Sequence, residues 1–234
     1  MMRNFKYGTQ VIHFKLIRED RKTLGITISP DKQIIVKAPK TKSDEDIYEK
    51  LRRKASWISR QIKYFDSLPP SVKERQFVSG ETHKYLGKQY RLKVIRSDEK
   101  KVCLKGGYIR VLIPDVSDKK RIEILLNKWY RKQADKRFRI YLKECYSIIQ
   151  KYDVPYPDLY IQKMKTRWGS CSINGRITLN INLIKHSSLS IKYVIMHELC
   201  HLKYHNHNKD FYQLLKRVMP DWEKRKYKLD HTEI

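Results

Sequence analysis

The sequence predicts an α+β protein, in which a β-rich N-terminal part with one helix is followed by a C-terminal part built around amphipathic helices. Before Pro114, apolar and polar residues alternate over several short runs, which is typical of half-buried strands. After Pro114, apolar residues recur with the period of a helix. With 40% hydrophobic residues among 234, the chain can bury one ordinary core or two small ones.

Several strands are expected in the N-terminal part. VIHFKLIRE, TLGITISP and QIIVKAP fall between Val11 and Pro39, and Pro30 and Asp31 supply the turn between the last two. These runs predict the start of a β-meander. Strand patterning returns in YLGKQYRLKVI and KVCLKGGYIRVLIP, where Gly106 and Gly107 predict a hairpin turn.

Two helices are predicted before residue 150. Ser43 begins the first, with Asp46 three residues later approximating a capping box, and the helix should end near Pro69. Its apolar face comprises Ile47, Leu51, Ala55, Ile58 and Ile62. A longer amphipathic helix follows Pro114 and carries Ile122, Leu125, Leu126, Trp129, Ala134, Phe138, Tyr141, Leu142, Cys145 and Ile149 on its apolar face. This change of character predicts a boundary near residue 117, between a β-rich module, 1–116, and a second domain, 117–234.

The charge balance is strongly basic, with 52 Lys and Arg against 25 Asp and Glu, a formal net charge of +27. Such a field attracts nucleic acid, nucleotides or acidic surfaces, and it also favours solubility. Both interpretations stay open, because the basic residues are spread along the chain. The polar face of the long helix, from Lys119 to Lys143, is basic throughout and fits either a solvated surface or a nucleic-acid contact.

The cysteines argue against a structural zinc module of the ribbon or finger type, because the four lie apart with no CxxC pair. The N-terminal residues contain no continuous apolar stretch of the signal-peptide kind, and no segment reaches the roughly 20 apolar residues of a membrane span. These features predict a cytoplasmic protein with reduced thiols and no membrane partner. The sequence shows no internal repeat.

The strongest chemical signal is an HExxH motif, His197-Glu198-Leu199-Cys200-His201, in a segment with a helical apolar stripe beginning near Ser190. Residues four apart lie on the same face of a helix, so His197 and His201 can reach one zinc ion. Glu198 is not needed as a ligand, and it can accept a proton from an attacking water. The motif therefore predicts a zinc-dependent hydrolase with Glu198 as general base.

A catalytic zinc site needs a third protein ligand, and His205 and His207 are the candidates. If the helix continued, His205 would lie roughly 12 Å along the axis from His197, too far to share an ion. Asn206 tolerates a left-handed conformation, so a helix break there would return His207 toward the metal. We expect His207, with His205 as the alternative.

Three separated motifs in order, TRWGSC, GRITLNINLI and IKYVIMHELCHLKYHNHNKDFYQLL, make the chain similar to the YgjP-like zinc metallopeptidase family, relatives of the SprT and WLM zincins. The resemblance implies a zincin-like C-terminal domain, metal ligands at His197, His201 and His207, and a catalytic Glu198. It also implies that the strand around Thr178 to Leu183 borders the cleft. Metzincins share the three-His spacing, but Tyr204 replaces the glycine of their extended motif.

Three functions compete at this point. The first is a zinc metallopeptidase acting on a protein or peptide substrate. The second keeps the metal but hydrolyses nucleoside triphosphates, notably UTP, an activity also associated with the family; against it, the sequence has no Gly-rich phosphate loop. The third is a basic nucleic-acid-associated binding protein with a structural metal. Arg167, in the TRWGSC turn, fits either stabilisation of developing negative charge or an ordinary surface position.

Overall fold

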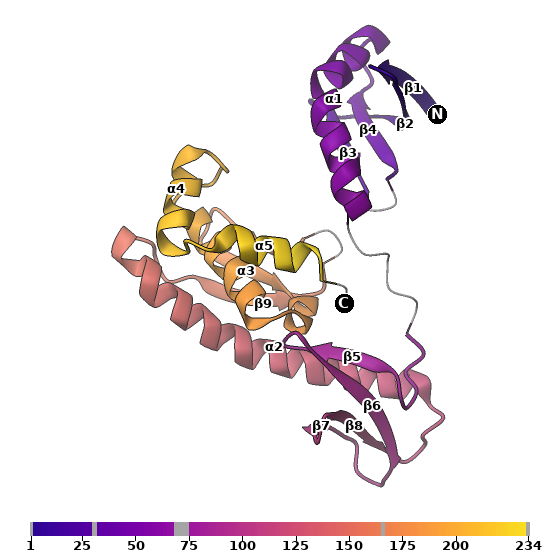
Figure 1. The fold of residues 1–234 in the computed structure, drawn as a ribbon, viewed down its shortest axis with the longest axis vertical. Helices are drawn as coiled ribbons and strands as arrows, with labels where there is room; N and C mark the ends of the chain where they lie inside the picture. The colour runs from indigo at the N-terminus through magenta and orange to yellow at the C-terminus, as the bar shows by residue number, and fades with distance from the viewer. Residues whose placement is uncertain (1, 30–31, 68–74, 165–166, 233–234) are drawn as a thin grey trace. The chain divides into compact units, whose positions relative to one another are not determined.

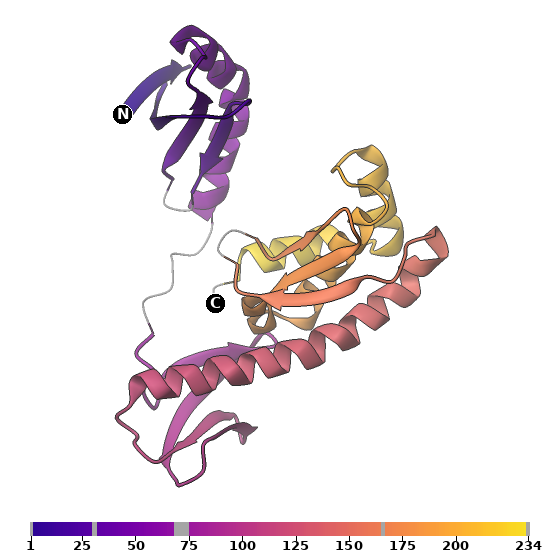
Figure 2. The same ribbon diagram turned by 180° about the vertical axis from the view of Figure 1, so that it is seen from behind.

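The computed structural model, shown from opposite sides in Figure 1 and Figure 2, describes residues 2–29, 32–67, 75–164 and 167–232. Contacts divide the chain into two compact units, Met1–Pro70 and Ser71–Ile234. Each unit has its own cluster of buried apolar residues. The architecture mixes three sheets with five α-helices among the described residues, in agreement with the predicted α+β class.

The N-terminal unit is a four-stranded sheet followed by one helix. Its elements are β1 (Met2–Tyr7), β2 (Gln10–Glu19), β3 (Gly25–Ile28), β4 (Ile34–Pro39) and α1 (Asp44–Ser67). The strand order is β1-β2-β4-β3, and β2 and β4 run parallel. The predicted meander is therefore wrong: β4, whose Ile34, Val36 and Ala38 are buried, takes an inner position between β2 and β3. The predicted turn at Pro30 and Asp31 lies outside the described residues.

Helix α1 confirms the predicted first helix. The Ser43 side chain accepts a hydrogen bond from the Asp46 backbone N–H at 3.1 Å, which satisfies one of the donors that a helix start leaves free. The predicted apolar face packs onto the sheet, and four of its members are at most 1% exposed: Ile47, Leu51, Ala55 and Ile58. The sheet and helix thus close a core of their own.

The C-terminal unit begins with a second sheet and helix. These are β5 (Thr82–Tyr85), β6 (Lys88–Arg96), β7 (Lys101–Lys105), β8 (Tyr108–Ile113) and α2 (Lys119–Ile149). The order is β5-β6-β8-β7, with β6 and β8 parallel and the outer pairs antiparallel, as in the first sheet. The chain therefore repeats one ββββα topology, in an N-terminal copy (residues 2–67) and a C-terminal copy (residues 82–149). The sequence alone had shown no repeat.

A third sheet and three more helices complete this unit. After the short 3-10 helix η1 (Gln150–Tyr152) come β9 (Asp158–Gln162), β10 (Gly169–Cys171), β11 (Arg176–Asn180), the 3-10 helix η2 (Ile181–Lys185), α3 (Ser188–His201), α4 (Lys209–Val218) and α5 (Trp222–Asp230). The strand order is β10-β11-β9. The predicted strand ITLNINLI ends at Asn180, because the Asn180 side chain accepts from the Asn182 N–H at 3.1 Å and starts the 3-10 turn.

The boundary predicted near residue 117 falls inside the C-terminal unit, whereas the compact units divide at residue 70. One core explains the difference, because it contains side chains from both sides of residue 117, such as Val111 of β8, Leu126 of α2 and Ile195 of α3. The change in sequence pattern there marks the start of a helix and not the edge of a domain.

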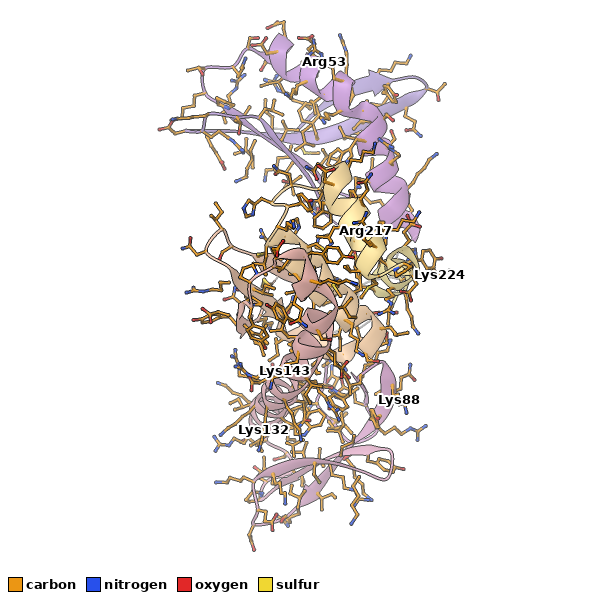
Figure 3. All side chains as sticks on the ribbon, turned by 90° about the vertical axis from the view of Figure 1, so that its left-hand side faces the viewer. Arg53, Lys88, Lys132, Lys143, Arg217 and Lys224 are labelled. Carbon is orange, nitrogen blue, oxygen red and sulfur yellow. The ribbon has the colours of Figure 1, made fainter. Side chains whose placement is uncertain are left out.

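Basic side chains project from many elements, including Arg53 on α1, Lys88 on β6, Lys143 on α2 and Arg217 on α4 (Figure 3). Most basic residues on α2 are exposed, as their amphipathic spacing predicted. Among the described helices, none combines the length and apolar character that crossing a membrane requires.

Candidate metal centre

The HExxH residues lie on α3, which begins where the sequence predicted a helix. The Ser187 side chain caps it by accepting a hydrogen bond from the Ser190 N–H at 3.3 Å. Buried apolar residues of the predicted stripe fix the helix in the core: Ile191, Val194, Ile195 and Leu199. His197 and His201 are one turn apart on the remaining flank, and their ring centroids are 4.9 Å apart.

The chain reverses directly after His201 and not at Asn206. The Leu202 N–H bonds to Leu199 O at 3.1 Å and the Tyr204 N–H to Cys200 O at 2.9 Å, which tightens the last turn of α3. Asn206 is not among the described residues with positive φ, so the predicted left-handed turn is wrong. Helix α4 starts three residues later and places His207 between the two helices.

Three imidazoles converge at this reversal. The His207 Nε2 lies 2.9 Å from the Nε2 of His197 and 3.1 Å from that of His201. Within the described part of the chain, these three histidines form a group of potential metal ligands whose atoms all lie within 4.8 Å of one another. His205 is exposed and does not join the group.

The protonation of the cluster suits a metal ion. The His201 Nδ1 lies 3.0 Å from Tyr204 O and donates its hydrogen there, which leaves the lone pair of Nε2 free. Burial, and then the charges of His201 and His207, lower the pKa of His197 to about 3. Burial also lowers the pKa of His201. A neutral imidazole offers a ring-nitrogen lone pair, which is the form in which histidine binds a divalent transition-metal ion.

Phe211, on α4, forms the floor of the cluster. Its ring centroid lies 5.0 Å from that of His197, 4.6 Å from His201 and 4.8 Å from His207, and the side chain is fully buried. The sequence does not reveal this role of Phe211, because an aromatic residue in an amphipathic helix carries no signal of what it packs against. Its packing restricts the rotamers of all three imidazoles.

Glu198 lies beside the cluster and is 6% exposed. Burial raises the pKa of this carboxyl to about 7, and Arg167 opposes the rise. The carboxylate rests against the backbone of β10: a Cβ at Gly169 would come within 2.7 Å of Glu198 Oε1. Glycine at residue 169 is therefore what lets the carboxylate approach the strand.

A cavity of about 240 Å³ opens beside these residues, lined among others by Arg167, Trp168, Gly169, His197 and Glu198. The TRWGSC turn thus borders the site, as its position in the sequence suggested, although Thr166 lies outside the described residues. Trp168 packs edge-on against the buried His186, with ring centroids 4.6 Å apart. The strand beside the cavity is the edge strand β10, whereas β11, expected there from the family resemblance, is the central strand.

Asn180 fixes this turn and was missed from the sequence. Its side-chain Nδ2 donates to Met164 O at 2.9 Å and to Arg167 O at 3.0 Å, and its backbone N–H bonds to Trp168 O at 2.8 Å. The side chain is buried, so these bonds are protected from water. An asparagine in an otherwise apolar strand run was the available signal.

The chain is similar to known proteins at the level of family sequence and of solved structures. The sequence model of the YgjP-like metallopeptidase domain matches residues 22–232. Among solved structures, the chain is similar to the metallopeptidase zymogen of Pyrococcus abyssi abylysin, at 24% sequence identity and a TM-score of 0.35, over 42% of this chain and 99% of that chain. The comparison with curated proteins gives no match.

The match over most of the chain defines the protein as a metallopeptidase, a hydrolase that depends on a metal ion. The chain belongs to the YgjP-like metallopeptidase family, and the predicted resemblance is confirmed. Because the matched residues extend from 22 to 232, they include parts of both compact units.

Proposed function

We propose that the protein is a zinc metallopeptidase in which His197, His201 and His207 hold the ion and Glu198 is the general base. The observation that carries the proposal is the convergence of three imidazole Nε2 atoms next to a buried carboxylate. Three histidine ligands with an open fourth position are typical of catalytic zinc, whereas structural zinc sites have four protein ligands. A zinc ion, when bound, supplies a Lewis acid at that position.

Glu198 is placed to move protons. It follows His197 in α3, so its carboxylate lies close to the ligands without having to bind the ion. It takes a proton from the water that attacks the peptide carbonyl and returns it to the leaving amine. The contact with Gly169 restricts the rotamers of the carboxylate, and the surrounding apolar residues limit its access to water.

The edge strand β10 is suited to align a peptide substrate. It pairs with β11 on one side only, so its other backbone edge can pair with an extended chain. Gly169 lies both on this strand and against Glu198, so a peptide on β10 would pass close to the general base. This placement favours a peptide over a nucleotide as the substrate.

The proposal predicts about one zinc ion per purified chain and a base-dependent peptidase activity. Glu198→Gln should keep the zinc, because the ligands remain, and should lower the rate of peptide hydrolysis by about a hundredfold or more. Metal analysis and turnover of a mixed peptide library measure the two quantities. Glu223→Gln, which changes an exposed carboxylate on α5, is the matched control and should keep both.

Three outcomes would contradict the proposal or part of it. Full activity of Glu198→Gln on the best peptide substrate would remove Glu198 from the role of base. Hydrolysis of nucleoside triphosphates, with no peptide cleaved and the same loss in Glu198→Gln, would keep the site and assign it to the nucleotide reaction. A chain that neither contains nor rebinds zinc would overturn the ligand assignment.

A further inference from the structure

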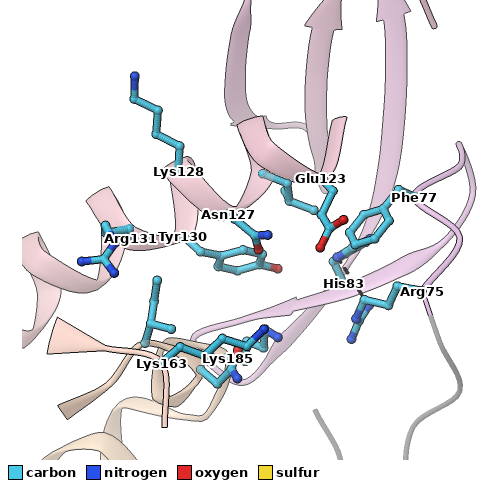
Figure 4. Close-up of a pocket in the computed structure, with 13 residues that line it drawn as sticks. Arg75, Phe77, His83, Glu123, Asn127, Lys128, Tyr130, Arg131, Lys163 and Lys185 are labelled. Atoms are coloured by element: carbon cyan, nitrogen blue, oxygen red, sulfur yellow. Dashed lines mark hydrogen bonds between the residues drawn. The ribbon is translucent and has the colours of Figure 1, made fainter. Parts of the chain in front are cut away.

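A second and larger cavity, of about 880 Å³, lies in the C-terminal unit (Figure 4). Its walls come from four segments: the residues before and in β5, the first half of α2, the chain after β9, and η2. It shares no lining residue with the cavity beside Glu198. The volume is in the range that pockets for small molecules occupy, about 300–1,000 Å³.

The cavity wall is strongly cationic. Five basic side chains line it, against one carboxylate, that of Glu123. The five are Arg75, Lys128, Arg131, Lys163 and Lys185. In the view of Figure 4, the Tyr130 ring lies between Arg131 and Lys163 at one end and Arg75 at the other.

Most of this charge has no counter-charge among the residues that the structure describes. Arg75 has the carboxylate of Glu81 at 3.6 Å and donates to Thr82 O at 2.9 Å. Arg131 donates only to a carbonyl, Ile161 O, at 3.2 Å. For Lys128, Lys163 and Lys185, no carboxylate of the described residues lies within ion-pair distance. An anion inside the cavity would supply the missing charge.

The pKa of Lys185 is lowered by burial and by the neighbouring positive charges of the cavity wall. Its ammonium lies 5.6 Å from the centroid of the Tyr130 ring, in a half-buried position. Burial, and then the charges of Arg75 and Lys163, lower the pKa of Lys185 to about 8. A cation held next to other cations costs free energy unless a ligand offsets the repulsion.

His83 adds a buried polar group to the same wall. It is 1% exposed, and its Nδ1 lies 3.4 Å from the Arg75 guanidinium, which can only donate. Burial, followed by the charges of Arg75 and Lys185, lowers the pKa of His83 to about 3, so the ring is neutral and carries its hydrogen on Nε2. That Nε2 makes no hydrogen bond among the described residues, and the Glu81 Oε2 lies 3.7 Å from it. The neutral ring therefore adds no charge to the wall, and the positive charge of the wall comes from its lysines and arginines.

We propose that this cavity binds a small molecule carrying two or more phosphate groups. One carboxylate on a ligand would leave most of the positive charge unbalanced, whereas several phosphates match it. A cavity enclosed by four segments suits a small molecule better than a nucleic-acid backbone, which binds along open basic surfaces. The inference is independent of the proposed hydrolytic function, because the two cavities share no residue.

Calorimetric titration of the full chain with inorganic tripolyphosphate tests the proposal. We expect one binding site per chain and an affinity about tenfold weaker in Lys185→Gln, which removes the central charge. Lys88→Gln, an exposed lysine on β6 outside the cavity, should bind like the unmodified chain. Tripolyphosphate could also remove the active-site metal, but this would occur equally in both variants. The difference in affinity between Lys185→Gln and Lys88→Gln therefore measures binding in the cavity alone.

A second variant protects the test against misfolding. Arg131→Gln changes an exposed side chain of the same wall and should weaken tripolyphosphate binding as well, even if Lys185→Gln unfolds. Equal affinities in the unmodified chain and in both cavity variants would overturn the proposal. Equally tight binding of citrate, which carries negative charge without phosphate, would also overturn it. So would binding of a short single-stranded oligonucleotide that is weakened by Lys185→Gln, if binding of tripolyphosphate is not weakened by the same variant.

Discussion

The two copies of the ββββα topology differ in what packs against them. In the N-terminal copy, α1 and the sheet bury one another, and their core contains only residues of that copy. In the C-terminal copy, α2 has 31 residues against 24 in α1, and its core continues into the third sheet and α3. Strand order and strand direction are the same in both.

The extra length of α2 links the copy to the metal centre. Its second half packs on α3, where the Lys192 ammonium donates to the Glu144 carboxylate at 2.6 Å and Cys145 Sγ lies 3.6 Å from Lys192 O. The comparison teaches that the shared topology is a scaffold, because the proposed metal ligands and general base belong to the segment that follows the second copy.

The largest expected effect, on zinc affinity, would test which histidine after α3 is the third metal ligand. His207→Ala should weaken zinc binding by more than about a hundredfold, because it removes one of three ligands. His205→Ala, two residues away and exposed, should leave it unchanged. Competition with a zinc chelator of known affinity measures both. A greater loss in His205→Ala would mean that the loop after α3 binds the metal in another arrangement.

An intermediate effect would test whether the copies are independent. Val36 on β4 and Val111 on β8 are fully buried and occupy the corresponding parallel strands of the two copies. Alanine at either position should cost about 2 kcal/mol of unfolding free energy. Only Val111→Ala should lower the thermal transition that added zinc raises. If Val36→Ala lowers the same transition equally, the copies unfold as one.

The effect that is smallest per unit change in condition concerns pH, and it again separates the copies. The buried His83 of β5 has a pKa of about 3 in the folded chain, against 6.5 when unfolded. Between these values the unfolded chain binds more protons, so the free energy of unfolding falls as the pH drops from 6.5 toward 3, by up to about 1.4 kcal/mol per pH unit. Above pH 6.5 this contribution is fully present.

Denaturant unfolding at several pH values measures the slope. His83→Gln should flatten it, whereas His13→Gln, at an exposed histidine of the N-terminal copy, should not. An unchanged slope in His83→Gln would assign the acid sensitivity to other groups, such as the equally buried His186, whose pKa burial lowers to about 4.

The metal-centre candidates could be predicted because they are close in sequence. His197 and His201 lie one helical turn apart, and the apolar stripe around them reports the helix. The turn that places His207 could not be predicted correctly. This turn depends on backbone hydrogen bonds of Leu202 and Tyr204. The segment contains no glycine that would mark the position of the turn in the sequence.

Features assembled from distant segments were beyond the sequence. The strand order differs from the expected meander, because β4 lies between β2 and β3. The alternation of apolar and polar residues predicts that a segment is a strand, but the neighbours of that strand depend on tertiary packing. The basic cavity brings Arg75 and Lys185 together across most of the C-terminal unit. The Asn180 side chain donates to the backbone carbonyls of Met164 and Arg167. Every residue type has such a carbonyl, so the sequence does not identify these partners.

The separate core of the N-terminal copy has a consequence for biosynthesis. Domains generally fold as units, the N-terminal one first, while the chain is made at about 5–20 residues per second. All strands of this copy and its helix precede Pro70, so its core can close while the ribosome still has residues 71–234 to add, which takes roughly 10–30 s. The metal centre has no such early start, because His207 is synthesised after all of α2 and α3, and α2 cannot bury its second half until α3 has been made.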